Sequence, residues 1–147
     1  MHIEIWDRTS LSEQERLVGR TKGVGAPLGA HDEFELADYQ AHRPDGLPVI
    51  DVNAHIRLAS AQNLGGVRIL RRGYNFVDGS DGSGHLNAGL FFIAFMRDPH
   101  AQFVPMQRAL ANNDEMMEYL EHTSSAVFAC PAGLGEGAYW GQSLLES

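Results

Sequence analysis

The segment Val67–Phe76, Val-Arg-Ile-Leu-Arg-Arg-Gly-Tyr-Asn-Phe, predicts a β-strand because β-branched and aromatic residues recur along it. The tract Asp78–Gly84, made of Gly, Ser and Asp with a final glycine, is typical of a turn or hairpin loop. The next segment, Leu90–Met96, reads Leu-Phe-Phe-Ile-Ala-Phe-Met without a polar residue. Such a continuous apolar run predicts a buried central strand.

Upstream of this pair, a strand, a helix and a long loop are expected. His2–Trp6 alternates polar and apolar residues and predicts a strand that starts abruptly at the beginning of the chain. Ser10 and Glu13 form a capping box, and Gly19 would end the helix that they start. Thr21–Leu47, 27 residues rich in Gly, Pro, Asp and His, has no sustained period and predicts a loop.

Downstream, a second helix is indicated by apolar residues at helical spacing, Phe103, Met106 and Leu110. Asp114 can cap a further short turn that carries Met117 and Leu120. Ser125–Cys130 predicts a last strand, ended by Pro131. The resulting order β-α-β-β-α-β predicts an α+β fold with an antiparallel sheet, two helices on one face and long loop insertions.

Composition limits the classes of protein to consider. A length of 147 residues suits one domain, and a net charge of −8 argues against a nucleic-acid partner. No apolar stretch approaches the roughly 20 residues of a membrane span, and no leader is visible. The single cysteine, Cys130, permits no internal disulfide and is expected to be a small core residue.

His55 is the one histidine in an apolar setting, flanked by Ala54, Ile56, Leu58 and Ala59. A half-buried neutral imidazole can ligate a metal or a haem iron, and an arginine held near it, from the pair Arg71-Arg72, could stabilise negative charge. From the residues alone, the simpler interpretation of His55 is a partly buried histidine with hydrogen-bond partners inside the protein. The simpler interpretation of Arg71-Arg72 is a solvated strand end. The seven histidines show no zinc spacing, and the tract Gly79–Gly84 lacks the lysine of a phosphate loop.

An ordered series of motifs favours the functional interpretation of His55 and Arg71. It runs through Ile3–Arg8, Glu13–Glu15, Gly19–Lys22, Gly25–Leu28, Ala54–Ala59, Ile69–Tyr74, Gly89–Phe92, Phe103–Gln107 and Tyr139–Gly141. Together these motifs resemble the C-terminal half of dye-decolourising peroxidases, in the subgroup that includes Tat-exported deferrochelatases. The resemblance implies a ferredoxin-like, haem-binding domain over residues 1–147, truncated at its N-terminus.

The resemblance also implies site residues. His55 matches the proximal histidine that ligates the iron of haem b, and Arg71 matches the catalytic distal arginine that acts on hydrogen peroxide. Arg20 matches a haem-contacting position, where a propionate is the group that its guanidinium would bind. Further haem contacts follow the histidine motif, where many members have Asn-Pro-Arg and this chain has Ser60, Ala61 and Gln62.

The resemblance further implies a peroxidase that oxidises dyes and phenolic compounds with hydrogen peroxide, using small aromatic reductants and no membrane partner. The family's distal aspartate lies upstream of this region, and Asp81 does not match it. Two alternatives remain: a non-catalytic haem-binding or iron-handling fragment, and a haem-free α+β domain that self-associates. A homo-oligomer or association with a missing N-terminal half is therefore expected. Family members are often exported by the Tat route, but the compartment stays open.

Overall fold

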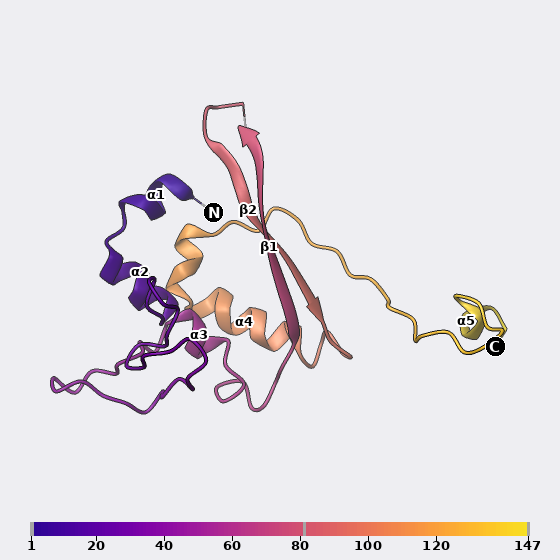
Figure 1. Ribbon diagram of the computed structural model, residues 1–147, viewed down its shortest axis with the longest axis horizontal. Coiled ribbons are helices and arrows are strands. Elements are labelled where there is room, and N and C mark those ends of the chain that lie inside the picture. The colour runs from indigo at the N-terminus through magenta and orange to yellow at the C-terminus, as the bar shows by residue number, and fades with distance from the viewer. Residues whose placement is uncertain (1, 81, 147) are drawn as a thin grey trace.

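The computed structural model describes residues 2–80 and 82–146 and combines short helices with one pair of antiparallel strands (Figure 1). The helices before residue 120 lie together on one side of the strand pair, and an extended C-terminal segment leads away from both to the last short helix. The elements are α1 (Ile3–Arg8), α2 (Leu11–Val18), α3 (His55–Leu58), β1 (Leu70–Ser80), β2 (Leu86–Phe95), α4 (Phe103–Asn113), the 3-10 helix η1 (Glu115–Tyr119) and α5 (Gln142–Leu145). The α+β class and the antiparallel pairing are confirmed.

Helix α2 forms as its caps predict. The backbone N–H of Glu13 donates to the Ser10 hydroxyl at 3.2 Å, and Gly19 ends the helix with a φ of 86°. A Cβ at Gly19 would lie 2.7 Å from Cγ1 of Ile56, so only glycine allows both this turn and the close approach of α3.

The helices α1 to α4 and η1, with the loops that join them, form what is called here the helical body (residues 2–66 and 98–120). Its centre is small and consists of Leu17, Ala26, Ile50, Ala54 and Met106, each less than a tenth exposed. Met106 belongs to the predicted apolar stripe of α4, which the structure therefore confirms. Helix α3 contacts both α2 and α4 and so lies between them.

The predicted loop between α2 and α3 contains no helix or strand, only isolated bridges that pair Arg20 with Pro27 and His42 with Pro48. It is fastened to α3 by Tyr39, whose hydroxyl donates to the carbonyl of Ile56 at 3.0 Å. This contact holds the long loop against the helix that carries His55.

Strands β1 and β2 form the predicted hairpin, although β1 starts three residues later than expected and continues to Ser80. Gly73 and Gly89 lie inside the strands for a steric reason. A Cβ at either position would lie 2.9 Å from a side chain on the other strand, Leu90 for Gly73 and Phe76 for Gly89. Each glycine therefore lets a large apolar side chain lie across the ladder. Asp81, in the connecting turn, lies outside the described residues.

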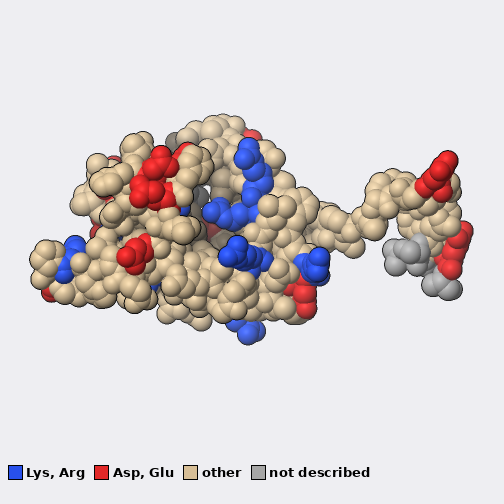
Figure 2. Space-filling view, turned by 60° about the horizontal axis from the view of Figure 1, so that its bottom comes forward, with Lys and Arg blue, Asp and Glu red and all other residues tan. Residues whose placement is uncertain are grey.

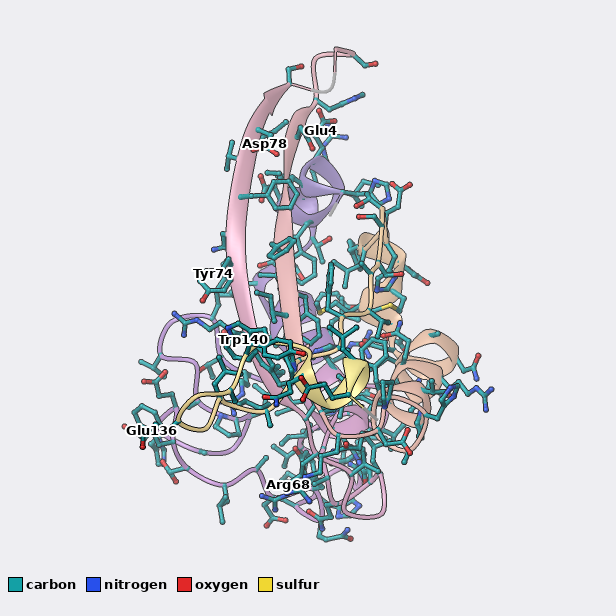
Figure 3. All side chains as sticks on the ribbon, turned by 90° about the vertical axis from the view of Figure 1, so that its right-hand side faces the viewer. Glu4, Arg68, Tyr74, Asp78, Glu136 and Trp140 are labelled. Atoms are coloured by element: carbon teal, nitrogen blue, oxygen red, sulfur yellow. The ribbon has the colours of Figure 1, made fainter. Side chains whose placement is uncertain are left out.

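The prediction of a buried central strand for Leu90–Met96 is wrong in this chain. Among the described residues β2 pairs only with β1, and Leu90, Phe91 and Phe95 are more than half exposed. In Figure 3 the hairpin extends past the helices, with Tyr74 projecting from it and Asp78 near its tip. Phe76 and Ile93 are half-buried, but most of the other large apolar side chains of the hairpin are exposed in the described part of the chain.

Two predicted strands are absent from the described residues. His2–Trp6 contributes to helix α1, whose Trp6 ring packs edge-on against Tyr119 at 5.1 Å between centroids. No neighbouring strand is available there, and a helix satisfies its backbone hydrogen bonds within the segment. Ser125–Cys130 is extended but unpaired, because β1 and β2 bond only to each other.

The C-terminal tail, residues 121–141, is almost wholly exposed and leads to α5 (Figure 1). Val127 and Phe128 are both 83% exposed, and Cys130 is exposed rather than in a core as predicted. In the space-filling view the end of this tail is a separate lobe joined to the rest by a narrow neck (Figure 2). Among the described residues, every helix is too short or too polar to cross a lipid bilayer.

Candidate functional site

His55 is the first residue of α3 and forms a hydrogen bond with a buried carboxylate. Its Nδ1 lies 2.6 Å from Oδ2 of Asp114, which stands 59 positions later at the start of η1. The side chain of Asp114 is fully buried and that of His55 is 31% exposed. The contact between α3 and α4 brings these two helix ends together.

Both oxygens of Asp114 have defined partners. Oδ2 faces His55, and Oδ1 accepts from the backbone N–H of Met116 at 2.9 Å, which is the predicted cap of the short turn. The sequence therefore located Asp114 as a cap, but its bond to His55 was not predicted. A separation of 59 residues matches no local spacing rule, and only tertiary packing brings the pair together.

This pair determines the chemistry of the imidazole. An ionised carboxylate only accepts hydrogen bonds, so in the neutral form of the ring this contact favours the tautomer with its proton on Nδ1 and its lone pair on Nε2. Metal-binding histidines are commonly oriented in this way by a carboxylate on the other ring nitrogen. His55 is thus prepared to donate Nε2 to a metal.

Arg71 and Arg72 differ in their surroundings although they are adjacent. The pairing of Arg71 with Ala94 and of Arg72 with Ile93 places them on opposite faces of the hairpin. The Arg72 guanidinium lies over the ring of Tyr74, 5.4 Å from its centre. Arg71 is exposed, and its side chain has no hydrogen bond or ion pair within residues 2–80 and 82–146. Of the two, Arg71 is the guanidinium free to meet a ligand, and it makes no contact with His55.

Arg20 is held by its own loop. Its Nη1 donates to the backbone carbonyls of Gly25 and Glu33, at 2.5 and 3.1 Å. Nη2 and Nε have no partner in the described part of the chain. The guanidinium is thus oriented by two carbonyls and retains donors for an external anion.

Ser60, Ala61 and Gln62, which follow the C-cap Ala59 of α3, form a turn. The Ser60 hydroxyl donates to the carbonyl of Arg57 at 2.8 Å and accepts from the backbone of Asn63, so it serves the turn itself. Ala61 is half-buried and its carbonyl accepts from Gly66, whereas Gln62 is exposed. Of this trio, Gln62 has the polar side chain best placed for another molecule.

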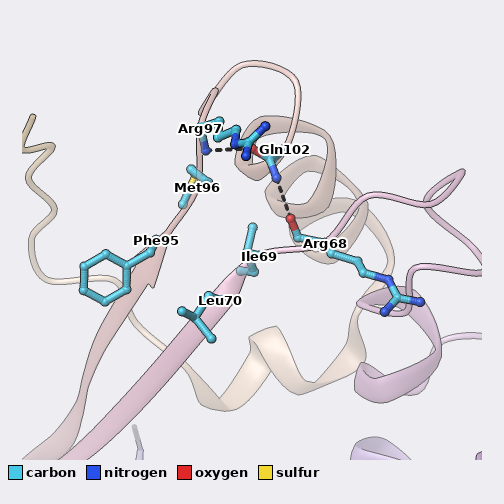
Figure 4. Close-up of a pocket in the computed structure, with 7 residues that line it drawn as sticks. All are labelled: Arg68, Ile69, Leu70, Phe95, Met96, Arg97 and Gln102. Atoms are coloured by element: carbon cyan, nitrogen blue, oxygen red, sulfur yellow. Dashed lines mark hydrogen bonds between the residues drawn. The ribbon is translucent and has the colours of Figure 1, made fainter. Parts of the chain in front are cut away.

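An open cavity with a volume of about 720 Å³ lies at the base of the hairpin and does not include His55 or Arg71 (Figure 4). Gln102 joins the two strand ends there, donating to the carbonyl of Arg68 at 2.7 Å and accepting from the N–H of Arg97 at 2.9 Å. This region is therefore a structural junction between hairpin and α4. A second cavity, of about 300 Å³, borders α2 and contains neither site residue.

The donor set suits a single-histidine site. Among the described residues there is no group of three or more His, Cys, Asp or Glu side chains that could hold a metal ion. A site built on His55 would thus provide one protein ligand, which fits an iron whose other ligands come from a macrocycle.

Comparison with known sequences gives consistent matches over the chain. The family model described as Dyp-type peroxidase, C-terminal, matches residues 1–134. A dye-decolorizing peroxidase of Thermobifida fusca is 42% identical over 99% of this chain, and a deferrochelatase of Escherichia coli is 38% identical over 98%. This chain spans about a third of the length of both relatives, 34% in each case.

Solved structures agree. Ferric DtpA from Streptomyces lividans superimposes over 100% of this chain with a TM-score of 0.94 and 37% identity, and the chain covers 40% of it. A DyP-type peroxidase from Cellulomonas bogoriensis superimposes with a TM-score of 0.93 and 40% identity, over 100% of this chain and 40% of its own. These matches support the ferredoxin-like α+β class. The chain belongs to the Dyp-type peroxidase family, whose C-terminal domain it contains.

Proposed function

We propose that this chain is the haem-binding C-terminal part of a dye-decolourising peroxidase, with His55 as the axial ligand of haem b. The observation that carries the proposal is the His55–Asp114 hydrogen bond, which engages Nδ1 and leaves Nε2 available on a partly exposed ring. A chain with this donor set and this family membership fits a haem better than an isolated metal ion.

Arg71 is proposed as the catalytic residue. An exposed guanidinium without an internal partner keeps all its donors for substrate, and it carries its charge at any working pH. It would orient hydrogen peroxide and stabilise the negative charge that develops as the O–O bond breaks. When bound, haem supplies the redox chemistry by which peroxide would oxidise dyes, phenolic compounds and other small aromatic reductants.

Arg20 and the trio Ser60, Ala61 and Gln62 are proposed as haem contacts of lesser weight. The two unpartnered nitrogens of Arg20 suit a propionate carboxylate. Since the Ser60 hydroxyl is already engaged, its contribution would be through shape and backbone.

The test is the Soret band of the purified chain after reconstitution with haem. We expect a Soret band for the wild-type chain. In His55→Ala we expect the band to be lost, or the haem affinity to fall by about tenfold or more. His122→Ala is the matched control, because His122 is exposed in the tail and should leave the band unchanged. Equal affinity and spectrum in the wild type and His55→Ala would refute His55 as the ligand.

Arg71→Ala is expected to keep the Soret band and to slow the peroxide-dependent spectral change by about 100-fold, the effect of losing one oriented charge-stabilising donor. Arg72→Ala is the control on the same strand, since its guanidinium lies over Tyr74. Equal rates for the two variants in stopped-flow absorption would remove Arg71 from the catalytic role.

A second function, iron handling without peroxide turnover, is favoured by the relatives named deferrochelatase. The two functions separate in one assay of the haem-loaded chain. Dye bleaching that depends on peroxide supports the peroxidase, and release of iron without bleaching supports the alternative.

The partner of this chain is also a proposal. The hairpin and tail expose apolar side chains, yet they follow the same path as in a solved relative of which the matched part is only 40%. We therefore infer that a polypeptide corresponding to that further part covers them, and that the chain alone self-associates through the same surface. A monomer in gel filtration at all concentrations would contradict the second half of this inference.

A further inference from the structure

Arg16 on α2 joins three carboxylates from three parts of the chain. Its Nη1 donates to Asp51 at 3.0 Å, and its Nη2 donates to Glu115 at 2.5 Å. Its Nε and Nη2 donate to the two oxygens of Glu13 at 2.8 and 2.6 Å. All three nitrogens of the guanidinium are thus engaged.

Two of these carboxylates flank the His55–Asp114 pair. Asp51 lies four positions before His55 on the segment that enters α3, and Glu115 directly follows Asp114. Asn53 on the first segment also donates to Glu115 on the second, at 3.2 Å. The segments that carry the histidine and its carboxylate are therefore held together at a second place, beside the hydrogen bond itself.

The arrangement depends on the positive charge. One guanidinium faces three carboxylates, which without it would repel one another and separate the two segments. The Arg16 hydrogen bond lowers the pKa of Glu13. Burial alone would raise the pKa of Asp51, but the backbone of Asn53 and the guanidinium together lower it. Conversely, these carboxylates raise the pKa of Arg16.

A displacement of Glu115 would also reach His55 through Asp114, because the two acidic residues are adjacent. Glu115 is the first residue of η1, and the cap of η1 is Asp114, whose Oδ1 accepts from Met116. Moving Glu115 would therefore rotate the Asp114 carboxylate away from Nδ1 of His55. A weaker bond at Nδ1 makes Nε2 a poorer donor to a metal.

We propose that Arg16 is a positioning residue, which sets the His55–Asp114 hydrogen bond by clamping Asp51 and Glu115. It does not touch the imidazole or any reacting atom. The proposal rests on the proposed function where it concerns haem, since the bond at Nδ1 then determines how strongly Nε2 binds the iron.

The first test needs no haem. In the NMR spectrum of the full chain, the Nδ1 proton of His55 should give a downfield, slowly exchanging signal. We expect Arg16→Met to move this signal upfield and to make exchange about tenfold faster. Arg97→Met is the matched control, because Arg97 is exposed at the base of the hairpin and lines a cavity that contains none of the cluster residues, and it should change nothing.

The second test uses the haem-loaded chain. Arg16→Met should shift the ferrous iron–histidine stretching band in resonance Raman spectra to lower wavenumber and move the reduction midpoint to a more positive potential. Arg16→Lys should recover part of both shifts, because it restores the charge but not the three-donor fork. Should circular dichroism show Arg16→Met unfolded, Glu115→Gln decides, since it removes one carboxylate and leaves the guanidinium in place.

The outcomes separate the two proposals. Signals of Arg16→Met and Glu115→Gln that equal those of the wild type would overturn the positioning role even if haem binds through His55. A response of the Nδ1 proton in a chain that takes up no haem would keep the positioning role and count against the proposed function.

Discussion

The helical body and the β1–β2 hairpin with its tail differ in how far their side chains are buried and paired within the chain. In the body, buried polar groups are matched: Gln14, only 5% exposed, donates to the carbonyls of Trp6 and Thr9 and accepts from Lys22. No buried side-chain nitrogen or oxygen lacks a partner in the described residues. In the hairpin and tail, by contrast, large apolar side chains such as Phe91, 63% exposed, face solvent.

The contrast indicates where each region obtains its stability. Contacts within this chain hold the body, and with it the His55–Asp114 pair. The hairpin, which carries Arg71, has backbone pairing within the chain but little side-chain burial. The two halves of the proposed site should therefore respond differently to mutation.

The largest expected effect is in the body. Ile50 is fully buried, so Ile50→Ala should lower the free energy of unfolding by about 3 kcal/mol through lost burial and the cavity left behind. Urea unfolding followed by circular dichroism measures it. Val127→Ala in the tail, 83% exposed, is the control and should change little; similar losses in both would erase the distinction between the regions.

Ser10→Ala should have a smaller effect on the same body. The Ser10 hydroxyl caps α2 by accepting from Glu13, and its loss should lower the free energy of unfolding by about 1 kcal/mol. Ser125→Ala is the matched control, because Ser125 is exposed in the tail and caps no helix. An unchanged urea midpoint in Ser10→Ala would mean that packing alone fixes the start of α2.

Acidification should weaken the body through the Arg16 cluster. Glu13 and Asp51 have lower pKa values in the folded chain than their ordinary values of 4.5 and 3.8, so the unfolded chain binds more protons as the pH falls. The stabilisation is thus present above about pH 4.5 and lost below it. Since these groups are partly exposed, we expect the ion pairs of Glu13 and Asp51 with Arg16 each to contribute about 0.5 kcal/mol to the free energy of unfolding.

Urea midpoints at pH 6 and pH 3 measure this loss, and Arg16→Met should show a shallower decrease than the wild type. If Arg16→Met loses as much stability on acidification as the wild type, the groups responsible for the acid sensitivity are not those of the Arg16 cluster.

The smallest effect on stability is expected in the hairpin. Phe91 and Phe95 point to one face of the sheet, and the double change to serine should alter the free energy of unfolding by less than about 0.5 kcal/mol. It should, however, reduce self-association in sedimentation velocity. If stability falls as far as in Ile50→Ala, the hairpin is packed against this chain after all.

Local signals predicted the elements that local chemistry determines. Ser10 and Gly19 gave both ends of α2, Asp114 gave the cap of η1, and the apolar runs gave the hairpin. The alternation in His2–Trp6 was misleading, because a strand needs a neighbour and the segment instead packs on Tyr119 as a helix.

Long-range features could not be predicted in this way. The bond between His55 and Asp114 and the convergence of Asp51 and Glu115 on Arg16 depend on how α2, α3 and η1 pack. Burial of Leu90–Met96 was inferred from hydrophobicity, which indicates that a surface needs cover but not whether the same chain supplies it.

The exposed tail carries the chain's single cysteine, Cys130, and this has a practical consequence. A maleimide dye can be attached there without engineering and without a competing thiol. Its emission and its rate of attachment would then report directly when the tail becomes covered, in titrations with a candidate polypeptide or with haem.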